Sequence, residues 1–242
     1  MNHQAFPWKT FGVLFGIGSI ALFLALPRPL NPGYFVISLS VLGIIVGVGL
    51  FLSRSVGLKA LVISSNSCGD NLPKLLQILA RATLIGIGLG TVILVVIRFV
   101  SLSILPEIRL RFTAESSLET WKRVVIAADS AVLEEMIFRL FLLSSLAWMV
   151  RKIWQLQRTP TPGIFWTINA LIAIGFGIAH LPQWSTITPL TPLVMLIVVF
   201  LNSIGGLIFG YLFYADGLAA AIVAHFFADV MLHVVGLSFL QT

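Results

Sequence analysis

The chain has 242 residues, of which 58% are hydrophobic and only 10% are charged. Soluble domains carry about a quarter charged residues, so this composition excludes an ordinary soluble enzyme and indicates a polytopic membrane protein. The formal net charge of +6 would suggest a nucleic-acid partner in a soluble protein. Here the basic residues lie mostly between apolar segments, where they orient membrane helices and contact anionic lipid headgroups. We therefore expect no nucleic-acid partner.

Seven apolar segments are long enough to cross a bilayer as helices, which takes about 20 residues each. They cover residues 11–26, 34–52, 79–105, 124–150, 163–181, 190–214 and 218–239. The expected fold is an all-α transmembrane bundle of seven or eight spans, in a multi-pass integral membrane protein that has the lipid bilayer as a partner.

The connections between these segments carry further predictions. A loop with an amphipathic interfacial piece at 72–79 is expected between the second and third segments. Residues 106–123 are rich in charges and predict a polar, helical connector on the membrane surface. The turn after Asp216 leaves that residue able to cap the last helix. The single cysteine, Cys68, excludes an intrachain disulfide and a multi-thiolate metal site.

The fourth segment contains Glu134, Glu135 and Arg139, and such charges cost about 3 kcal/mol or more each within a bilayer. Glu135 and Arg139 are four residues apart on one helical face, so they can pair. Glu134 points about 100° away and is free to face another helix. A buried ion pair that ties helices together explains Glu135 and Arg139, but it does not explain Glu134.

Two later segments each contribute a histidine. Phe176 precedes His180 by one turn near the end of the fifth segment, where a lone histidine is more often an interfacial residue than a ligand. His225 and Asp229 lie four residues apart in the last segment, so imidazole and carboxylate share one face. A carboxylate beside a histidine can fix the tautomer of the imidazole, as in metal and catalytic sites. Alternatively, two residues at this spacing form a hydrogen-bonded contact that only holds helices together.

Polar groups without partners are destabilising within a bilayer, so those of the last four segments should converge in the interior of the bundle, where an intramembrane polar cavity is expected. They are Asp129, Glu134, Glu135, Arg139, Asn169, His180, Asn202, His225, Asp229 and, near the end of its segment, His233. Carboxylates and histidines that face one cavity would form a hydrolytic or metal-binding centre.

The ordered trio Glu-Glu-x-x-x-Arg, Phe-x-x-x-His and His-x-x-x-Asp on successive membrane helices resembles the CPBP family of intramembrane proteases. That family includes the type II CAAX prenyl endopeptidases and the Abi, or bacteriocin-immunity, proteins. The resemblance covers about residues 123–237, and it divides the chain into N-terminal helices with a surface connector (1–122) and a catalytic core (123–242). Asp229 stands where the family often has asparagine, so donation from this position to an oxyanion would require protonation or a bound cation.

The resemblance implies an intramembrane endopeptidase that hydrolyses membrane-associated peptides or proteins, in a prokaryotic cell membrane. Glu134 would activate a water with help from His180, while His225 and Asp229 would position or stabilise the oxyanion. A zinc ion held by Glu134, His180 and His225 and a metal-free, glutamate-activated water are both compatible with these residues. The implied catalytic set is Glu134, His180, His225 and Asp229, supported by Glu135, Arg139 and Phe176.

Two other function classes stay open. A non-enzymatic immunity or scaffold protein would keep the polar cluster to hold its helices together. A proton-coupled transporter would relay protons through Glu134, His225 and Asp229, but transporters usually show internal repeats, and the polar residues here all fall in the second half of the chain. The sequence contains no Gly-x-Ser-x-Gly, Gly-x-Gly-Asp or His-Glu-x-x-His, so the glutamate mechanism is favoured among proteolytic ones.

Overall fold

The computed structural model describes residues 6–26, 29–60, 72–101, 104–105, 108–156 and 161–241, so Cys68 lies outside the described residues. Within these ranges every regular element is a helix, which confirms the all-α membrane bundle. Six helices, each counted with any short helical extension, are long and apolar enough to cross a membrane. They are α1 (Trp8–Ala25), α2 (Pro32–Ser55), α3 (Leu72–Val96), α8 (Pro162–Ala179), α10 (Pro192–Asp216) and α11 (Leu218–Asp229).

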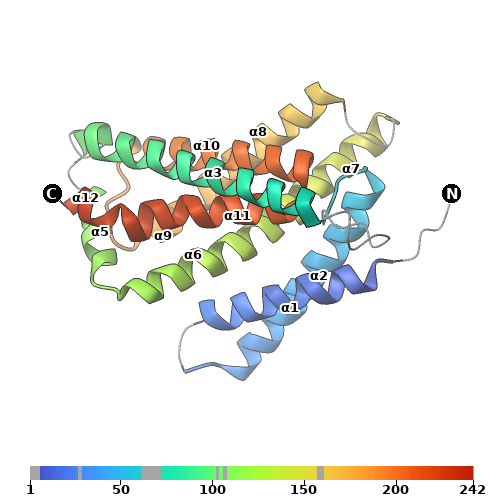
Figure 1. Ribbon diagram of the computed structural model, residues 1–242, viewed down its shortest axis with the longest axis horizontal. Helices are drawn as coiled ribbons and strands as arrows, with labels where there is room; N and C mark the ends of the chain where they lie inside the picture. The colour runs from blue at the N-terminus through green and yellow to red at the C-terminus, as the bar shows by residue number, and fades with distance from the viewer. Residues whose placement is uncertain are drawn as a thin grey trace.

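The fourth predicted segment forms one unbroken helical run of α6 (Thr120–Glu135), η2 (Met136–Leu143) and α7 (Ser144–Ile153). This run is not among the six apolar helices because it contains more charged residues than they do. This run lies inside the bundle, because α1 and α2 pack against one side of it and α11 packs against the other (Figure 1). On that second side α3 lies along α11, and α8 lies along α10.

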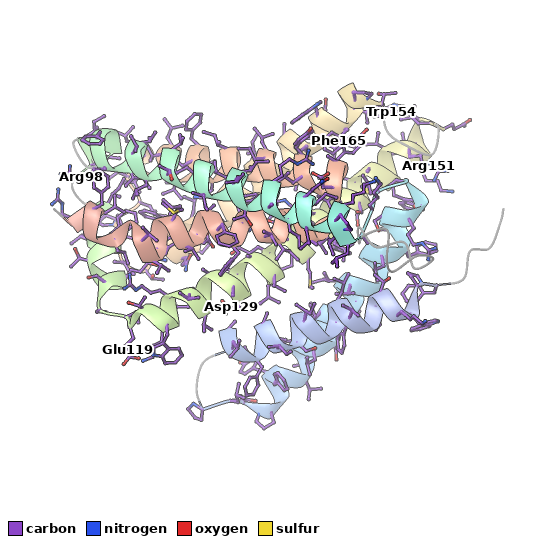
Figure 2. The ribbon with its side chains drawn as sticks, in the orientation of Figure 1. Arg98, Glu119, Asp129, Arg151, Trp154 and Phe165 are labelled. Atoms are coloured by element: carbon purple, nitrogen blue, oxygen red, sulfur yellow. The ribbon has the colours of Figure 1, made fainter. Side chains whose placement is uncertain are left out.

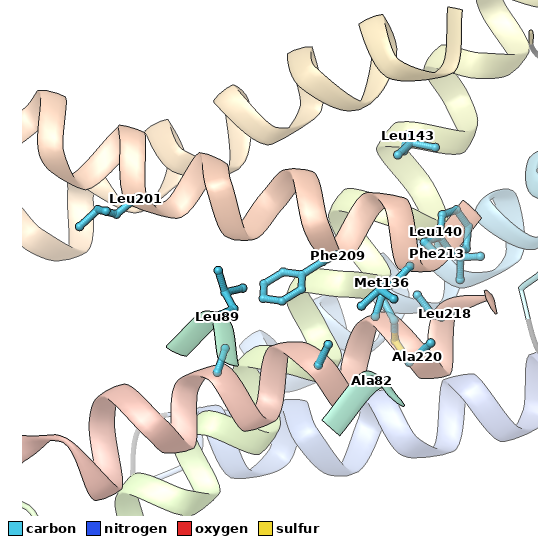
Figure 3. Packing of buried hydrophobic residues seen from close by; sticks show 14 of the residues in the cluster. Ala82, Leu89, Met136, Leu140, Leu143, Leu201, Phe209, Phe213, Leu218 and Ala220 are labelled. Carbon is cyan, nitrogen blue, oxygen red and sulfur yellow. The ribbon is translucent and has the colours of Figure 1, made fainter. Parts of the chain in front are cut away.

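The core between these helices consists of closely packed apolar side chains. Met136 and Leu140 of η2 are fully buried and pack near Phe213 of α10 and Leu218 of α11 (Figure 3). Many large apolar side chains instead point outward, where a bilayer would cover them. Examples are Ile20, Ile37, Leu84, Leu196 and Phe200.

The polar connector predicted over 106–123 contains the short helix α5 (Ile108–Ser116), which confirms its helical character. The interfacial piece predicted at 72–79 is wrong, because these residues form the first turns of α3. The helix continues without a break past Arg81, which forms an ion pair with Asp216 at the end of α10. The predicted capping role of Asp216 is also wrong, since Gly217 occupies the cap position of α11 with a φ of 96°.

The contact between α3 and α11 depends on glycine. A Cβ added to Gly90 would lie 2.6 Å from the carbonyl oxygen of Ala228, and one added to Gly86 would meet the carbonyl oxygen of Ala224 even more closely. Gly88, between them, has open space at that position. The backbone of α3 is therefore in direct contact with that of α11, the helix that carries His225 and Asp229. Small residues allow such close approach in membrane bundles.

We expect Gly86→Ala and Gly90→Ala to lower stability by about 1–3 kcal/mol each, because backbone atoms of α11 must move to admit the methyl group. Gly88→Ala is the matched control, and it should leave stability unchanged or raise it by up to about 1 kcal/mol through helix propensity. Unfolding midpoints of the three variants in one detergent test this prediction. Equal midpoints for all three would contradict the close α3–α11 contact.

Candidate active site

Three helices bring the predicted motif residues together. Glu134 and Glu135 end α6, His180 follows the last residue of α8, and His225 and Asp229 lie on α11. The carboxylate of Glu134 lies within 4 Å of the imidazoles of both His180 and His225, although these residues come 46 and 91 positions later in the chain. The convergence predicted for these residues is therefore confirmed as geometry.

Glu135 forms a buried network with its neighbours. Its Oε1 lies 3.0 Å from Nη1 of Arg139, as predicted from their spacing, and 2.9 Å from Nδ1 of His225. Arg139 also donates from Nη2 to the carbonyl oxygen of Gly206 on α10 at 3.0 Å. Both Glu135 and Arg139 are fully buried, so each charge depends on the other for compensation.

The contact with Glu135 fixes the orientation of the His225 imidazole. A carboxylate can only accept, so Nδ1 of His225 carries the proton and donates to Glu135. Nε2 then faces Oε2 of Glu134 at 3.8 Å and Oδ2 of Asp229 at 3.6 Å. Nε2 of His225 therefore faces the carboxylates of Glu134 and Asp229, while its Nδ1 is held in the core by Glu135.

His180 is oriented by its own helix. Its Nδ1 lies 2.8 Å from the carbonyl oxygen of Phe176 and must donate to it, because a carbonyl only accepts. Nε2 of His180 is thereby directed toward Glu134, with 3.9 Å between Nε2 and Oε2. The two imidazoles consequently turn equivalent nitrogens toward the same carboxylate oxygen.

Glu134 has no direct hydrogen-bond partner for its Oε2. Its Oε2 forms no hydrogen bond with any described residue, and the side chain is 29% exposed where it lines a cavity of about 140 Å³. Separations of 3.8 and 3.9 Å are too long for hydrogen bonds, but each suits a contact through one water. The cavity wall also includes Phe176, His180, Asn202, His225 and Asp229.

Two helices change from α to π geometry directly after their site carboxylates. η2 begins at Met136, after Glu135, and η3 (Val230–Val235) begins after Asp229. Such π segments are rare and are found frequently at functional sites, because they shift the angular position of the side chains that follow. The sequence carries no clear signal for them.

Not every polar residue of these segments lines the cavity. Asn169 donates from Nδ2 to the carbonyl oxygen of Leu207 at 2.9 Å, which fastens α8 to α10 away from the cavity. Asp129 is buried part-way along α6 and accepts from the backbone N–H of Ser130, and it does not line the cavity (Figure 2). Asp129, Glu135, Arg139 and Asn169 are thus buried in the bundle interior, as predicted, but they do not line the cavity.

A second polar cluster, which the sequence did not reveal as a cluster, lies at another part of the cavity wall. Glu115 of α5 is 2.8 Å from Nδ1 of His233, and Arg123 donates to the backbone carbonyl of His233 at 3.0 Å. Burial acts to raise the pKa of Glu115, but the hydrogen bond and charge of His233, with the charges of Arg111 and Arg123, outweigh burial and hold this pKa below its usual value. Arg111 packs over the ring of Trp184 and forms no ion pair with the described residues.

The fit of these side chains to a metal ion can be tested from their positions. Within the described residues, no three histidine, cysteine, aspartate or glutamate side chains are arranged to hold a metal ion. The arrangement of Glu134, His180 and His225 thus does not fit a preformed three-ligand zinc site, and we derive no step through zinc. The zinc site stays a prediction, which a chelator can test.

Comparison with known families matched residues 116–231 to the model described as type II CAAX prenyl endopeptidase, Rce1-like. These residues are similar to that family of intramembrane proteases, over slightly less than half of the chain. The match contains all three motifs and confirms the resemblance read from them. The curated proteins and the solved structures compared with the chain gave no match.

Proposed function

We propose that this Rce1-like protein is an intramembrane endopeptidase in which Glu134 activates a water molecule. The observation that carries the proposal is the position of Oε2 of Glu134, at the wall of a cavity and 3.8–3.9 Å from Nε2 of both His180 and His225. A water at this position can donate one hydrogen bond to Oε2 of Glu134 and the other to Nε2 of one histidine, so the carboxylate would polarise it and an imidazole would orient it.

In the proposed reaction, Glu134 takes a proton from this water as the oxygen attacks the scissile carbonyl carbon. Glu134 passes this proton to Nε2 of His225, which lies 3.8 Å from its Oε2, and the tetrahedral oxyanion then accepts a hydrogen bond from that N–H. Asp229, 3.6 Å from the same nitrogen, favours the charged imidazole rather than donating to the oxyanion itself. The proton on Nε2 of His225 passes to the leaving amine as the C–N bond breaks.

The experiment is cleavage of a peptide library, including prenylated peptides, by the purified protein in detergent, with the new termini identified by mass spectrometry. A parallel reaction contains a chelator. Cleavage that Glu134→Ala abolishes supports the proposed peptidase, and loss of cleavage with the chelator would assign a role to a metal. Equal cleavage by the wild type and by Glu134→Ala would refute Glu134 as the base.

The cavity also suggests how a substrate is oriented, and the family name suggests a substrate that is cut near its C-terminus. Arg111 and Arg123 add positive charge to the wall of this cavity, where Glu115 already pairs with His233. Among the described residues Arg111 forms no ion pair, and Glu134 and Asp229 line the same cavity. We propose that Arg111 receives the free carboxylate of the substrate.

Arg111→Gln should raise KM about tenfold for peptides with a free C-terminal carboxylate, since one charge-assisted hydrogen bond is lost. The same variant should leave KM nearly unchanged for the matched C-terminal amides. Arg109→Gln is the control, because Arg109 lies exposed on the same helix and does not line the cavity. Equal effects on acids and amides would reject Arg111 as the carboxylate anchor.

A further inference from the structure

Phe209 of α10 lies outside the three sequence motifs and packs directly against His225. Its ring is nearly parallel to the imidazole, with 4.6 Å between ring centroids and an interplanar angle of 15°. The side chain is only 3% exposed and reaches from α10 toward α11 beside Leu89 (Figure 3). Stacked aromatic pairs at this distance contribute beyond the burial of their area.

This stack limits the plane in which the imidazole can lie. His225 needs Nδ1 on Glu135 and Nε2 toward Glu134 at the same time, and rotation of its ring breaks both alignments. Phe209 covers one face of the imidazole, while Phe176 meets it nearly edge-on, with 5.7 Å between centroids and an angle of 76°. The hydrogen bond to Glu135 fixes one atom of the ring, and the flat contact with Phe209 fixes its tilt.

The Phe209 ring also faces Arg139, which forms the buried ion pair with Glu135. The guanidinium carbon of Arg139 lies 5.6 Å from the Phe209 centroid and 4.6 Å from the Phe176 centroid. Both distances are within the range of cation–π attraction. Phe209 therefore contacts His225 and the arginine that pairs with Glu135, so one side chain keeps water away from the hydrogen bond that sets the His225 tautomer.

We propose that Phe209 is a positioning residue that holds the His225 imidazole in the Nδ1–H tautomer and in the plane that points Nε2 at the reacting groups. This inference rests on the proposed function for its catalytic consequence, but not for the tautomer. Phe209 acts through His225, so the loss of the Phe209 ring changes the chemical step more than it changes substrate binding.

The chain offers a matched control for simple packing. Phe213 lies four residues further along α10, is fully buried, and makes no ring contact with either site histidine among the described residues. Phe213→Leu and Phe209→Leu remove the same volume from the same helix. Phe209→Met also removes the flat ring but has an unbranched, flexible side chain that fills irregular gaps, and it replaces the leucine variant if that protein does not fold.

The experiment combines kinetics with ¹⁵N NMR of histidine-labelled protein in detergent micelles, where the His225 signals are assigned by loss in His225→Gln. The wild type should show a protonated Nδ1 and an unprotonated Nε2 for resting His225. Phe209→Leu should mix the tautomers and lower kcat about tenfold with a smaller change in KM, while Phe213→Leu retains the wild-type signals.

Unchanged His225 signals in Phe209→Leu, or equal kcat losses in the two leucine variants, would overturn the inference. The NMR readout does not depend on activity, so it separates two kinds of failure. A wild type that cleaves no probe counts against the proposed function, whereas the tautomer result decides the role of Phe209 in either case.

Discussion

Glu134→Gln is expected to reduce peptide cleavage by a factor of about 10²–10⁴ while the protein stays folded. Glutamine has nearly the same shape and can still hydrogen bond to a water, but it cannot accept the proton that the attacking water releases. The wild-type carboxylate makes no direct hydrogen bond through Oε2 and is partly exposed to the cavity, so little structure depends on its charge. Initial cleavage rates and unfolding midpoints measure the two effects separately.

Asp129→Asn provides the control for this prediction. Asp129 is an acidic residue on the same helix, more deeply buried than Glu134 and away from the cavity. Its amide variant should retain activity within a few-fold. A protein that uses the polar cluster only to hold helices together predicts that Glu134→Gln and Asp129→Asn behave alike, and that outcome would favour the scaffold class.

Arg139→Met is expected to lower the free energy of unfolding by about 3–5 kcal/mol, because it leaves the Glu135 carboxylate buried without its cation. Arg139 is fully enclosed by Phe176, Phe209 and its hydrogen-bond partner on α10, so no water can replace the lost charge. Denaturant or thermal unfolding in detergent gives the change in stability.

Two further variants make the Arg139 prediction specific. Arg151→Met removes an arginine that donates to the Ser55 carbonyl from a half-buried position, and it should cost less than about 1 kcal/mol. Removing both charges with Glu135→Gln and Arg139→Met should recover part of the lost stability but not activity, since His225 loses its carboxylate partner. A single Arg139→Met variant as stable as Arg151→Met would contradict the buried network.

The sequence predicted the parts of the site that depend on spacing within one helix. The Glu135–Arg139 pair and the placement of Glu134 on a different face both follow from helical periodicity. The cost of charge in a bilayer predicted that the carboxylates and histidines of different helices would meet. The catalytic roles of these residues stay predictions.

What the sequence could not supply were contacts set by packing between helices. The bond from His225 to Glu135, and the stack of Phe209 on His225, depend on the rotation of each helix about its axis. Phenylalanine is frequent throughout the chain, with 18 residues, so Phe209 carries no distinguishing signal. The Glu115–His233 pair joins α5 to the last span, whereas helical spacing points Glu115 to Arg111 and His233 to Asp229 on their own helices.

The errors share a physical cause. Asp216 has the right residue type for a helix cap, but an arginine from another helix competes for its carboxylate. Asn71 and Pro73 predict a separate interfacial piece over residues 72–79, but these residues begin α3, and Arg81 of the same helix forms that ion pair with Asp216. In both cases one contact between distant segments overrides a local signal.

The most direct test of the central claim is mass spectrometry of protein and products after cleavage in H₂¹⁸O. A glutamate-activated water predicts one ¹⁸O in the new carboxylate of the N-terminal fragment and an unchanged protein mass throughout the reaction. A protein mass increased by that fragment would reveal a covalent intermediate and contradict the account. So would cleavage that proceeds equally fast in Glu134→Gln under the same conditions.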